Sequence, residues 1–455
     1  MIENFKISSR KLIEISIGVL LSCLLYFPLS MHWIQRSDTY VLFGTFMLLG
    51  GFLVWIMHQK PNLKTIIFIG VLFRLLLVPY IPSLSQDFYR YLWDGSIQLE
   101  GFNPYVSKPS DLLNQVSFPY ANQIYEAMGS LHNNNYSNYP PFSQWIYLLA
   151  AKVYYGELIS PILILRLFTL LGEVLVCVFG IKLLKYFRVS PTLIGWFILN
   201  PLIILESFGN LHFEALMAGL CLAGLYHIFQ NKLIFSSLFF SLAISTKLLP
   251  IFFLPVLFKF CSFKFFKRFI VCCGVFILIT WIPYIDYNLI SNYTQTLNLW
   301  FVNFEFNASL HYLLKEIHYL FYDFNIIKRI GPYTPFIIIS IILLISFIRK
   351  NNTPKSVLES CLLILTIYFF ISTTVHPWYI IFILVFGMML GYVYTMIWSL
   401  TVLWSYWAYQ SAGFAESLAI IAIEYGLVYS CFIIEMFRGP LLIKKPKEIK
   451  YFRFN

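Results

Sequence analysis

The segment 87–95, with the sequence D-F-Y-R-Y-L-W-D-G, combines two carboxylates and an arginine directly after an apolar run. On a helix, Asp87 and Asp94 share one face and Arg90 lies beside them, because residues three, four and seven apart align. Such a set can move a proton and hold an anionic group. The pattern therefore predicts an active site at the mouth of a membrane helix.

Composition places this segment in a membrane protein. The 455 residues are 59% hydrophobic and 12% charged, whereas soluble domains are roughly 25% charged. Apolar runs long enough for a bilayer of about 30 Å recur along the chain. The first run, 12–30, lacks a small-residue cleavage site, so we expect a retained helix and not a signal peptide. We predict a single integral-membrane domain, 1–455, with an all-α, polytopic helical bundle.

Neither the cysteines nor the net charge indicates a special site. All eight cysteines lie in or beside apolar runs without a C-x-x-C pair, which favours small core residues over disulfide or zinc roles. The formal charge of +11 comes from Lys and Arg in short turns between apolar runs. This scatter is typical of positive-inside topology and argues against nucleic acid as a partner.

Lys and Arg also orient the roughly 12 to 14 expected spans. With a cytoplasmic amino terminus, most of the 32 Lys and Arg residues fall in the predicted cytoplasmic pieces. These pieces are 1–11, 58–64, 182–190, 230–232, 259–268, 349–355 and 438–455. The spans are expected at 12–30, 40–57, 65–82, 160–184, 191–205, 213–229, 233–246, 248–259, 269–284, 332–348, 356–374, 378–392, 396–410 and 418–437.

The run 142–155 decides on which side of the membrane every later loop is placed. Its 14 residues are fewer than the minimum of about 17 for a spanning helix, and counting it as a span would place the cations of 182–188 outside. We therefore expect an interfacial helix that begins at Pro140 and Pro141. Segment 83–157 is then a long first extracytoplasmic loop that carries juxtamembrane helices and the predicted catalytic residues.

Further motifs follow in order on the same predicted face. They are G-F-N-P-Y at 101–105, Y-P-P at 139–141, N-P at 200–201, G-N-L-H-F-E-A-L at 209–216, T-K-L-L-P at 246–250 and H-P-W-Y at 376–379. With the segment from Asp87, this order resembles the bacterial GT-C integral-membrane glycosyltransferases, above all the mannosyltransferase-like enzymes that use polyprenyl-phosphate sugars. The resemblance extends to about Tyr379. It departs from the family at Glu214, where an aspartate is usual.

The resemblance implies a GT-C-like fold and an inverting hexosyltransferase. A hexose, most typically mannose, would pass from a polyprenyl-phosphate donor to an extracytoplasmic glycan or lipid acceptor, with no cofactor besides the donor substrate. The partners would be the lipid-linked donor, the acceptor and the membrane. The protein would lie in a bacterial inner membrane, with its active site on the extracytoplasmic face.

Glycosyl transfer to a hydroxyl needs a base that takes its proton. We predict that Asp87 is this base, and the alternative is a plain interfacial ion pair with Arg90. Asp94 either binds the acceptor or supports Asp87, or it only ends the helix. These two carboxylates are the predicted catalytic residues.

The departing phosphate needs cations or hydrogen-bond donors. We predict that Arg90, Lys247 and His376 contact it, with Arg166 as a further candidate. Snorkelling towards the interface is the alternative for Lys247. For His376, the alternatives are pairing with a carboxylate and a purely structural role.

Contacts with the sugar or the acceptor are expected from the same motifs. The candidates are Asn103, Tyr105, His212, Glu214 and Trp378. An architectural role is the alternative for the G-F-N-P-Y loop, because its proline restricts the backbone, and an interfacial belt is the alternative for Trp378. His311 and His318 show no further ligands, so we expect no metal site.

A transporter or flippase of a lipid-linked saccharide is the alternative class. A secondary transporter would show paired broken helices and deep charges. Glu173, Glu359 and Glu424 are candidate deep charges, but no paired interruption is evident. A flippase would bind the lipid without needing Asp87, so substitution there separates binding from catalysis.

Overall fold

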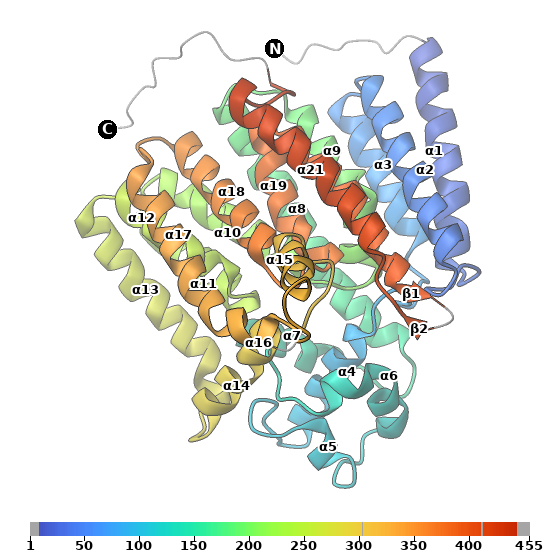
Figure 1. Ribbon diagram of the computed structural model, residues 1–455. Helices are drawn as coiled ribbons and strands as arrows, with labels where there is room; N and C mark the ends of the chain where they lie inside the picture. The colour runs from blue at the N-terminus through green and yellow to red at the C-terminus, as the bar shows by residue number, and fades with distance from the viewer. Residues whose placement is uncertain (1–8, 303, 411–412, 444–455) are drawn as a thin grey trace.

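The computed structural model describes residues 9–302, 304–410 and 413–443, which form a helical bundle with a smaller helical lobe below it (Figure 1). Among these residues, seven helices are long and apolar enough to cross a membrane. They are α1 (Ser9–Ser30), α2 (Thr39–His58), α8 (Ile159–Tyr186), α13 (Phe263–Trp281) with its extension to Tyr284, α17 (Thr334–Ile348) with the turn from Gly331 that precedes it, α18 (Pro354–Ile371) and α21 (Leu418–Arg438). The predicted all-helical polytopic bundle is confirmed, and the chain is an integral membrane protein.

Shorter helices complete the bundle. They are α3 (Leu63–Leu76), α10 (Glu214–Phe229), α11 (Leu233–Thr246), η3 (Leu249–Phe253), α12 (Leu254–Phe260), η4 (Ile282–Tyr284), η6 (Pro377–Tyr379), α19 (Ile380–Leu390), α20 (Val393–Thr401) and η7 (Val402–Ala408). Helices α8 and α10 approach very closely, because a Cβ on Gly172 would lie 2.3 Å from the backbone of Leu216. Small residues allow such contacts between membrane helices.

The expected span 191–205 is not one straight helix. It is divided into η1 (Pro191–Ile194), α9 (Gly195–Ile198) and the π-helix η2 (Ile203–Gly209). The two halves meet at an angle of 67°. The break falls at Asn200 and Pro201, because proline removes a backbone donor and disfavours helical geometry in the preceding residue. The π-helix then leads the chain directly into the G-N-L-H-F-E segment.

The predicted loop 83–157 folds as the lower lobe (Figure 1). Its helices are α4 (Asp87–Leu99), α5 (Pro109–Leu112), α6 (Ala121–Asn133) and α7 (Pro141–Ala151). Helix α7 begins with Pro141 in its first turn, as the Y-P-P motif predicts. Helices α4 and α7 touch at Gly95, where a Cβ would lie 2.2 Å from the carbonyl oxygen of Tyr147. This contact fixes the helix that carries Asp87.

Short elements from the second half of the chain lie around the lower part of the bundle. They are α14 (Leu289–Val302), α15 (Leu310–Tyr319), α16 (Ile327–Ile330), η5 (Gly331–Tyr333), β1 (Tyr409–Gln410) and β2 (Gly413–Phe414). In Figure 1, α15 is drawn in front of the bundle, α14 at its lower left and the two strands at its right. The two strands pair antiparallel, with Tyr409 opposite Phe414. Phe306 forms a separate bridge with Thr374, which ties the segment before α15 to the segment between α18 and η6.

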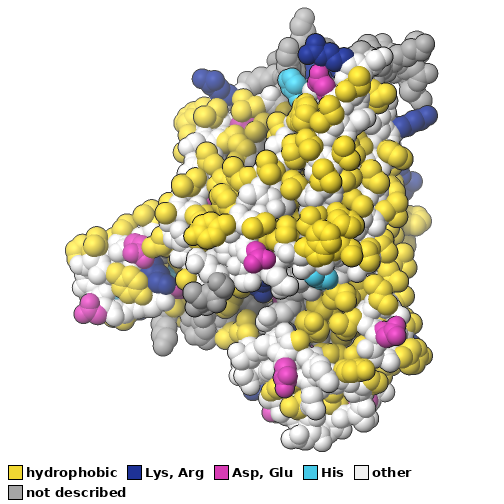
Figure 2. All heavy atoms as spheres, turned by 90° about the vertical axis from the view of Figure 1, so that its right-hand side faces the viewer, with side chains coloured by type: hydrophobic (Ala, Val, Ile, Leu, Met, Phe, Trp, Pro, Cys, Tyr) yellow, Lys and Arg dark blue, Asp and Glu magenta, His cyan; other side chains and the backbone are white. Residues whose placement is uncertain are grey.

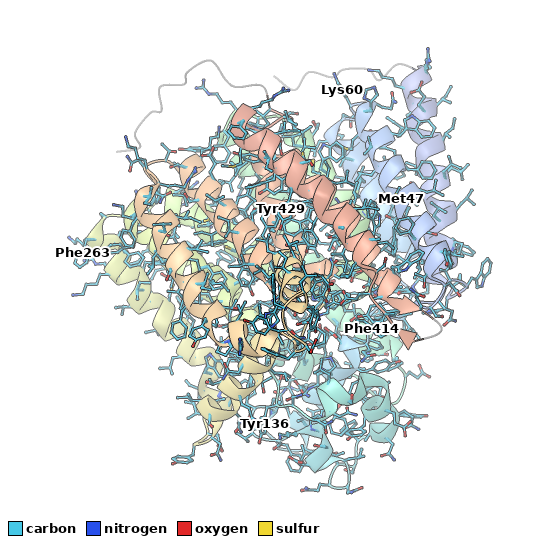
Figure 3. All side chains as sticks on the ribbon, in the orientation of Figure 1. Met47, Lys60, Tyr136, Phe263, Phe414 and Tyr429 are labelled. Carbon is cyan, nitrogen blue, oxygen red and sulfur yellow. The ribbon has the colours of Figure 1, made fainter. Side chains whose placement is uncertain are left out.

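The turn between α2 and α3 and the lobe lie at opposite ends of the molecule. Figure 3 places Lys60, between α2 and α3, at the upper end and Tyr136 in the lobe. Figure 2 shows hydrophobic side chains over most of the face that α1 and α2 form, as a lipid-facing surface requires. The terminal parts of the predicted cytoplasmic pieces, 1–8 and 444–455, lie outside the described residues.

Candidate active site

A cavity of about 590 Å³ lies where the lobe meets the bundle. This volume is typical of small-molecule sites. Its polar wall includes Arg36, Asp87, His132, Glu214, Lys247, Glu305 and His376. Its apolar wall includes Leu248, Leu249, Phe252, Leu297, Tyr368 and Phe369. We call this space the main cavity.

Asp87 is the first residue of α4, where the helix dipole favours a carboxylate. Its side chain is 19% exposed, and its Oδ1 accepts a hydrogen bond from His132 Nε2 at 3.3 Å. The Tyr139 hydroxyl donates to Oδ2 at 3.5 Å, and His212 Nδ1 lies 4.0 Å from the same oxygen. The carboxylate thus faces the main cavity with partners from three other segments.

The pKa of Asp87 lies well below its ordinary value. Burial alone would raise this pKa, but the hydrogen bond from His132 and the charge interaction with the same imidazole outweigh burial. Asp87 is therefore ionised at neutral pH. This is the form that a general base requires.

Asp94 and Arg90 do not reach the main cavity, although helix α4 forms as predicted. Asp94 is fully buried, and its two oxygens accept hydrogen bonds from Arg90 Nε at 2.7 Å and Gln144 Nε2 at 2.8 Å. Arg90 also donates to the carbonyl oxygens of His132 and Asn135. The structure therefore provides no contact between Asp94 and an acceptor, or between Arg90 and a phosphate, because the protein itself encloses both groups.

Of the other lysine and arginine candidates, Lys247 lines the main cavity and Arg166 does not. The Lys247 ammonium pairs with Glu214, the first residue of α10, and the Lys247 side chain stays 18% exposed. Arg166 is buried in α8 and donates to the carbonyl oxygens of Val78 and Tyr80. Arg166 thus holds the backbone that leads into the lobe.

His376 belongs to a stack of four rings. The ring centroids of His212 and Trp378 are 3.6 Å apart, those of Trp378 and His376 are 4.5 Å apart, and those of His376 and Phe306 are 4.8 Å apart. Burial lowers the pKa of His376 to about 3 and lowers that of His212 well below its ordinary value. Both imidazoles are therefore neutral at pH 7, so His376 offers a polar group and not the expected cation.

Asn103 and Tyr105 hold their own loop in place. Asn103 Oδ1 accepts from the Tyr105 backbone N–H at 3.1 Å, and its amide nitrogen donates to the Tyr284 carbonyl at 3.0 Å. Tyr105 is fully buried and its hydroxyl donates to the Tyr139 carbonyl at 2.6 Å. This geometry supports the architectural alternative for the G-F-N-P-Y motif.

Arg36 and His132 are cavity residues that the sequence candidates omitted. The Arg36 guanidinium lies 3.2 Å above the centre of the Tyr409 ring. One signal pointed to it, because an arginine between the first two expected spans lies on the predicted outer face, against the positive-inside bias. His132 stands in an asparagine-rich stretch without any periodic pattern, so the sequence gave no signal for it.

Glu305 is a third omitted residue of the main cavity. Its Oε1 accepts from His311 Nε2 at 2.9 Å, and its Oε2 pairs with Lys315. Burial raises the pKa of Glu305, but hydrogen bonds from His311 and Lys315 lower it to about 2. Across the described parts of the chain, no group of three or more His, Cys, Asp or Glu side chains could hold a metal ion.

A family comparison matches the part of the chain that carries most of this site. A family model described as alpha-(1->6)-mannopyranosyltransferase, N-terminal domain, matches residues 20–261, which is more than half of the chain. The chain is also similar to alpha-(1->6)-mannopyranosyltransferase A of Corynebacterium glutamicum, with 24% identity over 180 residues, covering 38% of this chain and 34% of that protein.

Two further relatives show the same extent of similarity. Alpha-(1->6)-mannopyranosyltransferase B of Corynebacterium glutamicum is 28% identical over 145 residues, 32% of this chain and 23% of that protein. Alpha-(1->6)-mannopyranosyltransferase A of Mycobacterium tuberculosis is 26% identical over 172 residues, 37% of this chain and 31% of that protein. The matched part thus spans about a third or less of the length of these relatives.

Proposed function

Because the chain belongs to the alpha-(1->6)-mannopyranosyltransferase family, we propose that it transfers mannose from a polyprenyl-phosphate donor to a glycan or glycolipid acceptor. The product linkage would be alpha-(1->6), in keeping with the names of its relatives. We assign the lobe and the main cavity to the extracytoplasmic face of a bacterial inner membrane, opposite the basic turns. The enzyme would be an inverting glycosyltransferase of the GT-C type.

One observation carries this proposal: a partly exposed carboxylate, two cationic side chains and an apolar wall share the main cavity. Asp87 supplies the carboxylate, and Arg36 and Lys247 supply positive charge. A polyprenyl-phosphate sugar has matching parts, an isoprenoid chain for the apolar wall and a phosphate for the cations. Phe252 and Tyr368, whose rings meet edge to face with centroids 5.1 Å apart, form part of that wall.

The proposed chemistry assigns one task to each group. Asp87 accepts the proton of the acceptor hydroxyl as its oxygen forms a bond to the anomeric carbon of mannose. The bond from that carbon to the phosphate oxygen breaks, and the electron pair leaves with the phosphate. Lys247 and Arg36 stabilise the negative charge that gathers on this leaving group. Glu214 keeps the Lys247 ammonium on the cavity wall through their ion pair.

An alpha product formed with inversion requires a beta-linked mannosyl phosphate. Purified protein in nanodiscs, given radiolabelled mannose as the beta-linked polyprenyl phosphate, the alpha-linked isomer or GDP-mannose, tests donor class and stereochemistry together. Transfer from the beta-linked lipid alone is the expected result, with Asp87→Asn as the inactive control. Transfer from GDP-mannose would refute the lipid donor, and lipid translocation that persists in Asp87→Asn would favour a flippase.

The assigned orientation can be tested with single cysteines. Ser110 in the lobe and Ser262 before α13 are both exposed and come from opposite ends of the predicted map. An impermeant maleimide added to intact cells should label Ser110→Cys but not Ser262→Cys, with the wild-type chain as the background control. Labelling of Ser262→Cys alone would invert the orientation.

A further inference from the structure

A second, more open cavity of about 440 Å³ lies beside the main one. It is formed by the loop between α1 and α2, the segment that enters α4, and the start of α8. The residues that belong to it alone are His32, Ile81, Pro82, Ser83, Tyr89 and Leu158. We call it the side groove.

The side groove and the main cavity share the side chains of Arg36, Ser85 and Gln86. These residues adjoin Asp87, because Gln86 precedes it and the Asp87 backbone N–H donates to Ser85 Oγ at 3.3 Å. Asp87 itself lines only the main cavity. The wall that the two spaces share is therefore formed by the residues next to the predicted base.

The linings of the two spaces differ in chemistry. The main cavity has an aliphatic and aromatic wall, as a lipid chain requires. The side groove adds the Ser83 hydroxyl and the rings of His32 and Tyr89, and it shares the Gln86 side chain with the main cavity. The Ser83 hydroxyl also bonds to the Tyr80 hydroxyl at 2.8 Å, and Gln86 Nε2 donates to the Met128 carbonyl oxygen at 3.0 Å. Sugars offer hydroxyl groups for hydrogen bonds and C–H faces for aromatic rings, so this set of groups suits a carbohydrate.

The two spaces also extend to different sides. The main cavity reaches Leu297 of α14, whereas the side groove reaches the ends of α1 and α8. Figure 1 shows α14 and α1 on opposite sides of the molecule, with α4 and α6 between them at the lower end. Inverting displacement needs the acceptor oxygen to approach the anomeric carbon from the side opposite the leaving phosphate.

We infer that the side groove binds the acceptor glycan and delivers its hydroxyl to Asp87 from the side opposite the lipid donor. This inference rests on the proposed function and identifies where the second substrate binds. Arg36, which lines both spaces, would separate the acceptor sugar from the donor phosphate.

Blocking the groove tests this assignment. Ser83→Trp and Leu158→Trp would each place an indole in the side groove, and Ser110→Trp adds the same side chain to an exposed part of the lobe as a control. The protein is held in nanodiscs because sugar-based detergents would compete. The probe is alpha-(1->6)-linked mannobiose, with its KM in transfer measured kinetically and its direct binding measured by saturation-transfer NMR.

Each blocking variant that retains the thermal unfolding profile of the wild type should raise the KM for mannobiose at least about tenfold, a change worth about 1.4 kcal/mol. The KM for the lipid donor should stay within twofold, and Ser110→Trp should match the wild type. Unchanged mannobiose binding in both variants, or an equal loss of donor affinity, would overturn the assignment. Should the wild type transfer no mannose while both variants still lose mannobiose binding, the proposed function fails and the groove assignment stands.

Discussion

Helix α4 carries two carboxylates in contrasting surroundings. Asp94 is enclosed, with Arg90 and Gln144 bonded to its two oxygens, whereas Asp87 keeps 19% of its side chain exposed and faces the main cavity. The two residues share a helix face but lie about 10 Å apart along the axis. Only the first turn of α4 borders the cavity, because α7 covers the following turns at Gly95.

This difference separates a structural ion pair from a group that is available for chemistry. The Arg90–Asp94 pair lies within α4 and is enclosed by protein, and Gln144 joins it to α7, so neither group is accessible to a substrate. A carboxylate with long contacts to Tyr139 and His212 can still accept a proton from a bound molecule. Matched substitutions at the two positions should therefore change different properties.

The largest effect is expected from Asp87→Asn. Mannose transfer should fall by about 10²- to 10⁴-fold, because the amide keeps the shape of the side chain but cannot accept the proton. Donor affinity and thermal stability should remain near the wild-type values. Asp111→Asn, an exposed acid in the same lobe, is the matched control. Wild-type turnover in Asp87→Asn would assign the base to another residue.

Asp94→Asn should instead lower the free energy of unfolding, by about 3 to 5 kcal/mol, because it leaves the buried Arg90 guanidinium without its counter-charge. Turnover per folded molecule should stay close to that of the wild type. Chemical unfolding in nanodiscs measures the first quantity, and the double variant Arg90→Met with Asp94→Leu should recover much of the loss. A fall in turnover like that of Asp87→Asn, with normal stability, would make Asp94 catalytic after all.

Lys247 is intermediate between the cavity-facing Asp87 and the enclosed Asp94, because it is paired with Glu214 yet partly exposed to the main cavity. Lys247→Met should weaken donor binding by about one to two decades, since a charge-assisted contact contributes roughly 1.5 to 3 kcal/mol. Titration with a polyprenyl phosphate measures this, with Lys108→Met in the lobe as the control. Equal affinity in the two variants would leave Arg36 as the phosphate ligand and indicate that Lys247 only anchors α11.

The smallest effect is a shift in pH dependence on replacing His132. In His132→Ala, burial acts on Asp87 without the opposing hydrogen bond, so the pKa of Asp87 should rise. Because the base must be ionised, the acid limb of kcat/KM should then move to higher pH, and activity should be lost earlier as the pH falls. His58→Ala, exposed at the other end of the molecule, serves as the control. An unchanged acid limb in His132→Ala would show that His132 does not set the pKa of the base.

Some parts of the site were accessible from sequence alone because they depend on local pattern. Pro141 begins α7, and the segment from Asp87 forms a helix, because proline and an acidic first turn both favour a helix start. The broken helix at Asn200 and Pro201 was missed, because the run 191–205 was counted as one apolar span despite its proline, and a π-helix has no simple sequence signature.

The two cation candidates Arg166 and Lys247 show more clearly what sequence pattern cannot predict. Arg166 and Lys247 look alike in sequence, as single basic residues near the ends of apolar runs. In the structure Arg166 donates its hydrogen bonds to backbone carbonyl groups, whereas Lys247 faces the main cavity. The sequence could not separate them, because the partners of Arg166 come from a segment almost ninety residues away.

The sequence by itself determined that this is a polytopic membrane protein, that its polar motifs gather at one end, and that the helix from Asp87 belongs to that end. Composition, run length and the distribution of Lys and Arg suffice for this, because the bilayer imposes the same requirement on every span. Only the tertiary structure decided which carboxylate faces the cavity and which is enclosed. That choice depends on the contact at Gly95 and on His132 and Arg36, which other elements bring to the site.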